Sequence, residues 1–137
     1  MTTNAVTETP AAPSARAVVH FAERLTFETD CSDVNAAMRS GTPGFILVDV
    51  RGPKLFAEGH VAGAINIPHR ALTPERLAAY PHDTLFVVYC AGPHCNGATK
   101  GALRLARLGR PVKEMIGGIE GWRDECYDLQ DSEYVPD

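Results

Sequence analysis

The sequence predicts an α/β domain in which helices cover both faces of a parallel sheet. Two apolar runs, residues 45–50 (FILVDV) and 84–90 (TLFVVYC), have the continuous hydrophobic character of strands that are buried on both faces. Helical patterns separate the strand patterns along the chain, and this alternation is typical of βαβ units. The length of 137 residues fits one compact domain and is too short for two ordinary ones.

The N-terminal segment differs in composition from the rest of the chain. Residues 1–14 are rich in Thr, Ala and Pro without an apolar period, so we expect a flexible arm before a single domain at residues 15–137. Residues 15–25 predict a helix, because their apolar side chains recur at helical spacing. That apolar face is expected to pack on the domain or on a second copy of the chain, so a homodimer is one expected assembly. The residues at this spacing are Val18, Phe21, Ala22 and Leu25.

The first half of the domain alternates extended and helical patterns. Ser32 and Thr73 are predicted helix N-caps, because a hydroxyl side chain can accept a hydrogen bond from a free backbone N–H group. Proline after Thr73 suits the first helical position. The expected strands cover residues 26–29, 45–50 and 64–68, and the expected helices cover 32–38, 54–58 and 74–80.

The second half predicts a buried strand, a loop that contains glycine, a helix, a strand and a last helix. Gly109 is the expected C-cap of the first of these two helices. Ligands of parallel α/β sheets bind at the carboxyl ends of strands. The loop after Cys90 is therefore the first place to look for a site. The expected ranges are 84–90, 98–108, 112–116 and 119–126.

Composition and charge exclude several classes of protein. Hydrophobic residues make up 45% and charged residues 22%, as in globular domains, and a net charge of −4 argues against a nucleic-acid or membrane-surface binder. No stretch approaches a membrane span and the N-terminus lacks a secretory pattern, so we expect a cytoplasmic protein with reduced thiols. The four cysteines are Cys31, Cys90, Cys95 and Cys126; the first and last are expected to be buried or without a role.

Residues 90–100 (CAGPHCNGATK) place a thiol between a buried strand and a helix start. A helix N-terminus presents unpaired N–H groups and partial positive charge, so it should lower the pKa of a cysteine there. Small residues let the chain curl so that several amides face one sulfur. The alternative is that Cys90 is a small apolar residue that ends a buried strand.

Four segments resemble the signature motifs of the rhodanese family. They are DVR at 49–51, EGHVAGAINIP at 58–68, VVYC at 87–90 and GGIEGW at 117–122, in the order and spacing of the family. The resemblance extends over about residues 32–125. It implies a rhodanese-like fold, with a parallel five-stranded sheet and helices on both faces.

The resemblance also implies that Cys90 is the catalytic residue of a sulfurtransferase. Cys90 would accept sulfane sulfur from a small donor as a persulfide, and would pass it to a thiol, a protein or another nucleophilic acceptor. Neither a metal nor an organic cofactor is expected, and nucleic acid and membranes are not expected partners. The rival hypothesis is a rhodanese-like module that binds a partner or senses oxidants without turnover.

The loop after Cys90 departs from the family pattern. It is about two residues longer than the common six-residue loop and holds no arginine, so His94 is its only potential cation. A persulfide donor therefore suits it better than thiosulfate. A related phosphatase would need an arginine six residues after the cysteine, where Asn96 or Gly101 stands instead. The residues expected to form the substrate-binding loop are Ala91, Gly92, Pro93, His94, Asn96, Gly97 and Ala98.

The second thiol of the loop, Cys95, leaves several interpretations open. It could resolve an oxidised Cys90 by forming a disulfide, act as the primary nucleophile because it lies nearer the helix, or have no partner. Cys90, His94 and Cys95 could supply three zinc ligands, but structural zinc generally takes four. Cys90 remains the preferred nucleophile because it occupies the family position.

Four residues outside the loop have expected roles. Arg51 is expected to pair with an acidic neighbour such as Glu58, and His60 to make a structural hydrogen bond. Trp122 is expected to anchor the last helix in the core. His69 either faces the mouth of the site or has a structural role.

Overall fold

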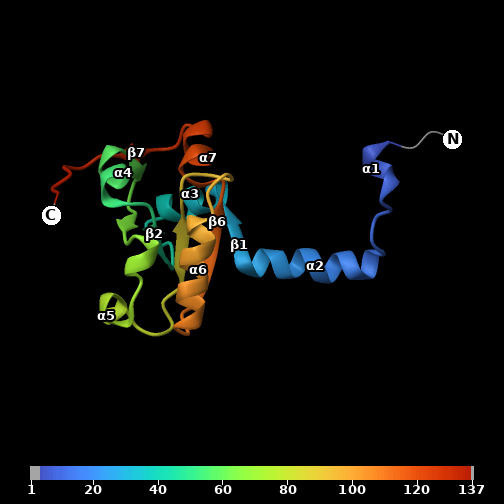
Figure 1. Cartoon of the computed structure of the whole chain (residues 1–137), viewed down its shortest axis with the longest axis horizontal. Coiled ribbons are helices and arrows are strands. Elements are labelled where there is room, and N and C mark those ends of the chain that lie inside the picture. Colours follow the sequence, from blue (N-terminus) through green and yellow to red (C-terminus); the bar gives the residue numbers. More distant parts are fainter. Residues whose placement is uncertain (1–3, 137) are drawn as a thin grey trace.

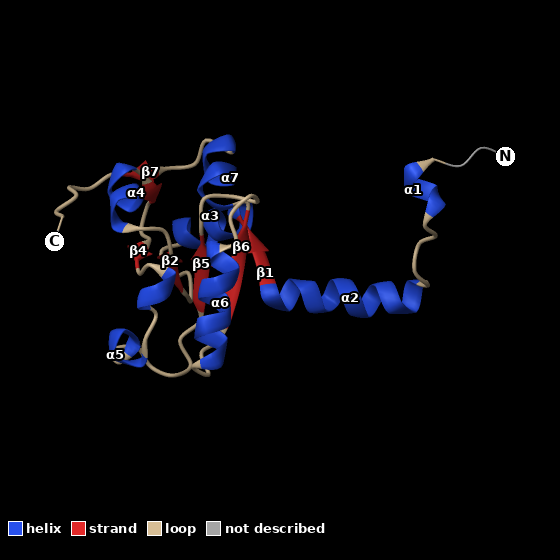
Figure 2. Ribbon diagram, viewed as in Figure 1, coloured by secondary structure: helices blue, strands red, loops and turns tan. Residues whose placement is uncertain are grey.

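The computed structural model describes residues 4–136 and shows a five-stranded parallel sheet with helices on both faces (Figure 1 and Figure 2). The strand order is β1-β6-β5-β2-β4, and β3 and β7 form a separate antiparallel pair. The predicted α/β class and five-stranded parallel sheet are confirmed. The helices are α1 (Ala5–Glu8), α2 (Ser14–Phe27), α3 (Cys31–Arg39), α4 (Pro53–Glu58), the 3-10 helix η1 (His69–Ala71), α5 (Pro74–Leu77), α6 (Gly97–Arg107) and α7 (Gly118–Asp124). The strands are β1 (Glu28–Asp30), β2 (Ile46–Asp49), β3 (His60–Val61), β4 (Ile65–Asn66), β5 (Phe86–Tyr89), β6 (Val112–Ile116) and β7 (Leu129–Gln130).

The central strand β5 explains why the sequence shows a continuous apolar run. All four of its residues are buried, because both of its neighbours and the helices on both faces cover it. Side chains alternate across a strand, so Phe86 and Val88 join one apolar cluster while Val87 and Tyr89 join the other. Each face of β5 therefore packs against one of the two halves of the core.

The two clusters lie on opposite faces of the sheet. One packs beneath α3 and α7 and contains the only tryptophan of the chain, Trp122, which is 2% exposed. The other packs beneath α5 and α6 and contains Leu77, Leu105 and Cys90. Cys90 thus extends from the end of β5 toward the α6 side of the sheet.

All five strands run in the same direction, so their carboxyl ends meet at one edge. Asp49 and Tyr89 are paired in register at the ends of β2 and β5, and Cys90 follows Tyr89 at once. The end of β6, at Ile116, leads directly into the turn before α7. This edge brings the β5–α6 loop and the β6–α7 turn together.

Some predicted boundaries are wrong for local physical reasons. The N-cap of α3 is Asp30 and not Ser32, because the Asp30 carboxylate accepts the Asp33 N–H group at 2.8 Å. The helix that Thr73 caps is confirmed, with the Arg76 N–H group 3.2 Å from the hydroxyl oxygen, but it ends at Leu77 rather than near residue 80. The predicted strands 45–50, 64–68 and 84–90 extend beyond the observed ones at their ends, and residues 112–116 agree with β6. The predicted strand 26–29 is shifted, because residues 26 and 27 belong to α2 and β1 ends at Asp30.

The N-terminal helices extend away from the sheet (Figure 1). Helix α1 lies within the predicted arm, of which residues 1–3 fall outside the described part of the chain. Helix α2 is longer than predicted and none of its residues is buried, so the expected packing of its apolar face on its own domain is wrong. None of the helices in residues 4–136 is long and apolar enough to cross a membrane.

Candidate active site

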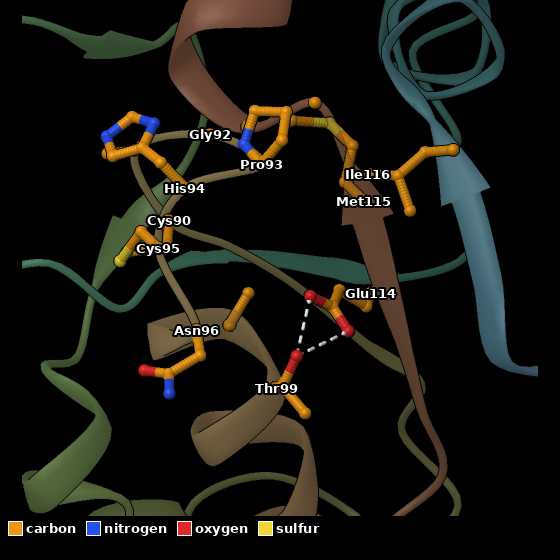
Figure 3. Close-up of a pocket in the computed structure, with 14 residues that line it drawn as sticks. Cys90, Gly92, Pro93, His94, Cys95, Asn96, Thr99, Glu114, Met115 and Ile116 are labelled. Atoms are coloured by element: carbon orange, nitrogen blue, oxygen red, sulfur yellow. Dashed lines mark hydrogen bonds between the residues drawn. The ribbon is translucent and has the colours of Figure 1, made fainter.

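A pocket of about 860 Å³ opens at the carboxyl edge of the sheet, where the β5–α6 loop faces the end of β6 (Figure 3). The structure places Cys90, Cys95 and all the predicted loop residues except Gly97 on its wall. The sequence did not predict the opposite wall, which β6 and the β6–α7 turn form, because no local pattern shows that β6 lies beside β5. The residues missed are Thr99, Glu114, Met115, Ile116, Gly117 and Gly118.

Backbone hydrogen bonds hold the loop in place at both ends. The Cys95 N–H group donates to the Gly92 carbonyl at 3.0 Å, which closes a turn inside the loop. From across the pocket, the first amides of α7 donate to the start of the loop: Ile119 N–H to the Cys90 carbonyl at 3.0 Å and Glu120 N–H to the Ala91 carbonyl at 2.9 Å. The β6–α7 turn therefore fixes the position of the candidate nucleophile.

Glycine is required at two points of close approach. At Gly97, the first residue of α6, an added Cβ would lie 2.8 Å from Cys90 Sγ and 3.4 Å from Cys95 Sγ. Gly118 has φ +59°, and an added Cβ there would lie 2.5 Å from the Cys90 carbonyl oxygen. Gly97 thus leaves room for both sulfur atoms beside the helix N-terminus, and Gly118 lets α7 reach the loop.

The Cys90 thiol is nearly enclosed, with 7% of the residue exposed. Burial and, to a smaller extent, the neighbouring Cys95 side chain raise its pKa to about 11, although the Ala91 amide acts in the opposite direction. The expected lowering of the Cys90 pKa is therefore wrong. Its sulfur lies in the apolar cluster beneath α6, where loss of hydration outweighs the helix N-terminus.

The anion-stabilising effect expected at Cys90 acts on Cys95 instead. Cys95 is half-buried, and its Sγ accepts the Gly97 N–H group at 3.4 Å. The adjacent Cys90 thiol lowers the Cys95 pKa, burial opposes this, and the Gly97 and Ala91 amides and Lys100 lower it further. At rest the site therefore favours a protonated Cys90 beside a more acidic Cys95.

Charged groups around the pocket are mostly acidic. Thr99 donates its hydroxyl to the Glu114 carboxylate at 3.1 and 3.2 Å, as the dashed lines in Figure 3 show. His94 lies 3.6 Å from Glu120, and both side chains are exposed. None of the described residues that line the pocket is an arginine or a lysine. The described wall of the pocket therefore provides neither an arginine nor a lysine to hold a dianion, and Lys100 lies outside that wall.

The residues outside the loop have mainly structural roles. Arg51 makes the expected structural ion pair with an acidic residue, but its partner is the fully buried Asp49 at 2.7 Å and not the candidate Glu58. Arg51 also donates to the Gly59 carbonyl. His60 makes the expected structural hydrogen bond, between Nδ1 and the Phe56 carbonyl at 2.7 Å. Trp122 is buried as expected and donates to the Asp128 carbonyl.

His69, Cys31 and Cys126 do not line the pocket, but the Cys31 thiol donates to the carbonyls of the lining residues Ile116 and Gly118 at 3.6 Å. His69 begins η1 beside Gly101 of α6 and is not on the pocket wall. Cys31 is buried and Cys126 is exposed. Within residues 4–136, no three His, Cys, Asp or Glu side chains are grouped so that they could hold a metal ion.

Comparisons with known proteins agree with the fold and the order of motifs. The model of the family described as "Rhodanese-like domain" matches residues 31–125. The chain is 34% identical over 88 residues to the thiosulfate sulfurtransferase GlpE of Stutzerimonas stutzeri, which covers 64% of this chain and 76% of that protein. It is also 45% identical over 78 residues to the HTH-type transcriptional regulator Rv0324 of Mycobacterium tuberculosis. That match covers 56% of this chain but only 34% of the regulator's length.

Solved structures give the same result. The crystal structure of the BH2092 protein from Bacillus halodurans matches with a TM-score of 0.84 and 38% identity, over 87% of each chain. The match covers 87% of this chain, whereas residues 31–137 make up less than four-fifths of it. The match therefore includes part of the segment before Cys31. The fold, the cysteine at the end of β5 and the family match over residues 31–125 lead to one conclusion. The chain belongs to the rhodanese-like domain family.

Proposed function

We propose that the chain transfers sulfane sulfur from a small donor to a thiol acceptor through a persulfide on Cys90. The observation that carries this proposal is the position of Cys90 Sγ, on the pocket wall at the end of β5 and beside the first turn of α6. The GlpE relatives, named thiosulfate sulfurtransferases, support the reaction class.

The reaction consists of two displacements at sulfur. In the first, Cys90 Sγ attacks the outer sulfur of a persulfide R–S–SH; an S–S bond to Cys90 forms, the S–S bond of the donor breaks, and R–S⁻ leaves with the bonding electron pair. In the second, an acceptor thiolate attacks the outer sulfur of the Cys90 persulfide, and the Cys90 thiolate leaves. Splitting the transfer in this way replaces one difficult step with two easier ones.

Cys95 supports the first displacement by accepting a proton. The Cys90 thiol must lose its proton to attack, and burial raises its pKa to about 11. The adjacent Cys95 has a lowered pKa, so it provides a thiolate at the Cys90 sulfur at a lower pH than an ordinary thiol would. As the new S–S bond forms, the Cys90 proton passes to Cys95 and the negative charge of the pair leaves on R–S⁻.

The charges of the pocket favour a persulfide over thiosulfate as the donor. Thiosulfate is a dianion, and the described lining residues include the Glu114 carboxylate but neither arginine nor lysine. A thiol persulfide has a low charge and makes its main contacts through sulfur. We therefore expect a low-molecular-weight persulfide to load Cys90 faster than thiosulfate does.

Peptide mass spectrometry tests this proposal. The protein is incubated with thiosulfate, a trisulfide or a low-molecular-weight persulfide, and Cys90 is expected to gain about 32 Da, the mass of one sulfur atom. Cys90→Ser should abolish transfer to an added thiol, and Cys95→Ser should slow it but leave a Cys90 persulfide that can be detected. The proposal fails if none of the donors loads Cys90, or if Cys90→Ser transfers sulfur at the wild-type rate.

A second candidate function is a dithiol redox module. The observation that favours it is that both sulfur atoms lie against Gly97, 2.8 and 3.4 Å from the position of an added Cβ. A peroxide would oxidise one thiolate to a sulfenic acid with release of hydroxide, and the other thiol would then displace water to form the disulfide. After mild peroxide treatment this hypothesis requires a Cys90–Cys95 disulfide; two free thiols would exclude it.

A further inference from the structure

Helix α2 carries an apolar face that no other part of residues 4–136 covers. The helix leaves β1 at the edge of the sheet and extends away from the domain (Figure 2). On one side, Val18, Phe21 and Leu25 recur at helical spacing and are 68%, 57% and 71% exposed. Arg16 and Glu23 lie on the opposite side of the helix, because the residue spacing turns them away from this face. The helix is therefore amphipathic, and its apolar face is exposed to solvent in a single copy of the chain.

An isolated helix of this length is barely stable in water. Helices shorter than about 12–15 residues gain too little from backbone hydrogen bonds to form alone, and most of their stability in proteins comes from packing of the apolar face. Helix α2 has 14 residues, contacts its own domain only around its C-terminal end and has no buried residue. The exposed apolar face therefore indicates that α2 packs against a partner molecule.

A groove of about 540 Å³ lies where α2 meets the domain. Phe21 and Leu25 of α2 form one wall, and Ile116 at the end of β6, which is 42% exposed, contributes apolar surface on the other. Five charged residues also line the groove: Arg24, Glu28, Asp30, Asp33 and Lys113. Arg24 is paired with Glu28, so the carboxylates of Asp30 and Asp33 leave the β1–α3 side of the groove acidic, while Lys113 lies on β6.

We propose that α2 of a second copy of this chain occupies this groove, and that the two copies exchange their helices about a two-fold axis. Each chain supplies one projecting helix and one groove at the base of that helix. Reciprocal exchange therefore covers both helices and fills both grooves in a closed dimer. The two helices would run antiparallel, with the N-terminal half of each lying on the domain of the other. This proposal does not depend on the chemistry of Cys90.

The area that must be buried favours this arrangement over a contact between the helices alone. A 14-residue helix is about 21 Å long and about 10 Å across, so one face offers on the order of 300 Å². Stable interfaces bury about 800 Å² on each partner. Two helices that touch only each other fall short of this, whereas an exchanged helix covers both the partner helix and the partner groove.

Charge complementarity favours the same orientation. The N-terminus of a helix has a partial positive charge, and the first turn of α2 contains no acidic residue that would offset it. In the antiparallel exchange this end reaches the groove that contains Asp30 and Asp33. Ile116 lines both the groove and the active-site pocket, so the second copy would lie against one wall of that pocket.

Two adjacent valines provide a matched test on the full chain. Val18 and Val19 are 68% and 60% exposed in one protomer, but only Val18 lies on the face with Phe21 and Leu25. Sedimentation equilibrium should give the wild type twice the chain mass of 14.8 kDa. Val18→Glu should reduce the mass to 14.8 kDa, and Val19→Glu should remain a dimer at the same concentration. Far-UV circular dichroism of the Val18→Glu protein distinguishes a folded monomer from a misfolded chain.

Hydrogen exchange provides a second measurement that does not rely on a substitution. The α2 amides of the wild type should exchange more slowly as protein concentration rises, while the β5 amides should not change. A wild-type mass of 14.8 kDa overturns the proposal, whether α2 then binds another protein or a lipid surface. Equal dissociation by Val18→Glu and Val19→Glu overturns it as well.

Discussion

The two sulfur atoms of the site differ in environment although they are only five residues apart. Cys90 lies in the apolar cluster beneath α6, where burial raises its pKa to about 11. Cys95 lies nearer the solvent, accepts the Gly97 N–H group and has a lowered pKa. A difference in burial thus separates the thiol that is protected from solvent from the thiol with the lower pKa.

Alkylation as a function of pH tests this difference. A lowered pKa means that the Cys95 thiolate is present below the pH at which an ordinary thiol ionises, and a raised pKa means that Cys90 remains protonated well above it. At pH 7, iodoacetamide should therefore label Cys95 before Cys90, with labelling of Cys90 increasing only toward pH 11. Exposed Cys126 gives the rate of an accessible thiol in the same digest. Labelling of Cys90 ahead of Cys95 at pH 7 would contradict this assignment.

The buried ion pair beside the site is expected to matter for stability. Asp49 is 0% exposed and its carboxylate accepts hydrogen bonds from the Arg51 side chain at 2.7–3.1 Å. Arg51→Ala would leave a buried carboxylate without a cation, so the free energy of unfolding should fall by about 3–5 kcal/mol. Urea titration followed by tryptophan fluorescence measures this change.

An exposed pair between α2 and β1 is the control for that measurement. Arg24 lies 2.7 Å from Glu28, but the side chains are 54% and 31% exposed. Arg24→Ala should therefore change the free energy of unfolding by less than about 1 kcal/mol. Similar losses for Arg51→Ala and Arg24→Ala would show that burial does not set the strength of the inner pair.

At the level of elements, two helix N-termini converge on the same loop. Helix α6 begins immediately after it and brings the Gly97 amide to Cys95, while α7 donates amides to the carbonyls of Cys90 and Ala91. The sequence predicts the first contact, because the loop precedes a helix along the chain. It does not predict the second, because α7 reaches the loop only through the pairing of β5 with β6.

Gly97→Ala tests whether α6 sets the spacing of the sulfur atoms. Alanine is favoured over glycine in a helix by about 1 kcal/mol, so propensity alone predicts a more stable protein. The added Cβ would nevertheless lie 2.8 Å from Cys90 Sγ and force a sulfur to move. Persulfide loading of Cys90 should slow by at least about tenfold, because displacements of reacting atoms near 1 Å have effects of this order or larger.

Gly52→Ala is the matched control for this element. Gly52 precedes α4 at φ −64°, and an added Cβ there would meet no atom within 4 Å. Loading of Cys90 should therefore remain at the wild-type rate. An unchanged rate in Gly97→Ala as well would mean that the sulfur positions do not depend on the start of α6.

At the level of the whole molecule, one sheet joins the two halves of the core. Val87 and Val88 are neighbours on β5, yet they belong to different clusters and are 2% and 0% exposed. Because both clusters rest on the same strand, neither can lose its packing while the other stays intact. The domain should unfold as a single cooperative unit.

Paired substitutions on β5 test this cooperativity. Val87→Ala and Val88→Ala should each lower the free energy of unfolding by about 2 kcal/mol, the cost of removing two buried methyl groups and leaving a cavity. Trp122 lies only in the cluster of Val87, but its fluorescence should report both changes equally. A Val88→Ala protein with a normal fluorescence transition and an earlier transition by circular dichroism would show that the two faces unfold separately.

The sequence by itself determined the α/β class, the buried strands β2 and β5, and the position of Cys90 after a strand and before a helix. These features follow from patterns within a few residues, such as continuous apolar runs, helix caps and motif spacing. Only the tertiary structure decided that Asp49 pairs with Arg51, that β6 and α7 complete the pocket and that the face of α2 is uncovered. It also decided that Cys95 and not Cys90 is the more acidic thiol. The physical reason is that burial and contact depend on segments far apart in the sequence, whose positions local patterns do not contain.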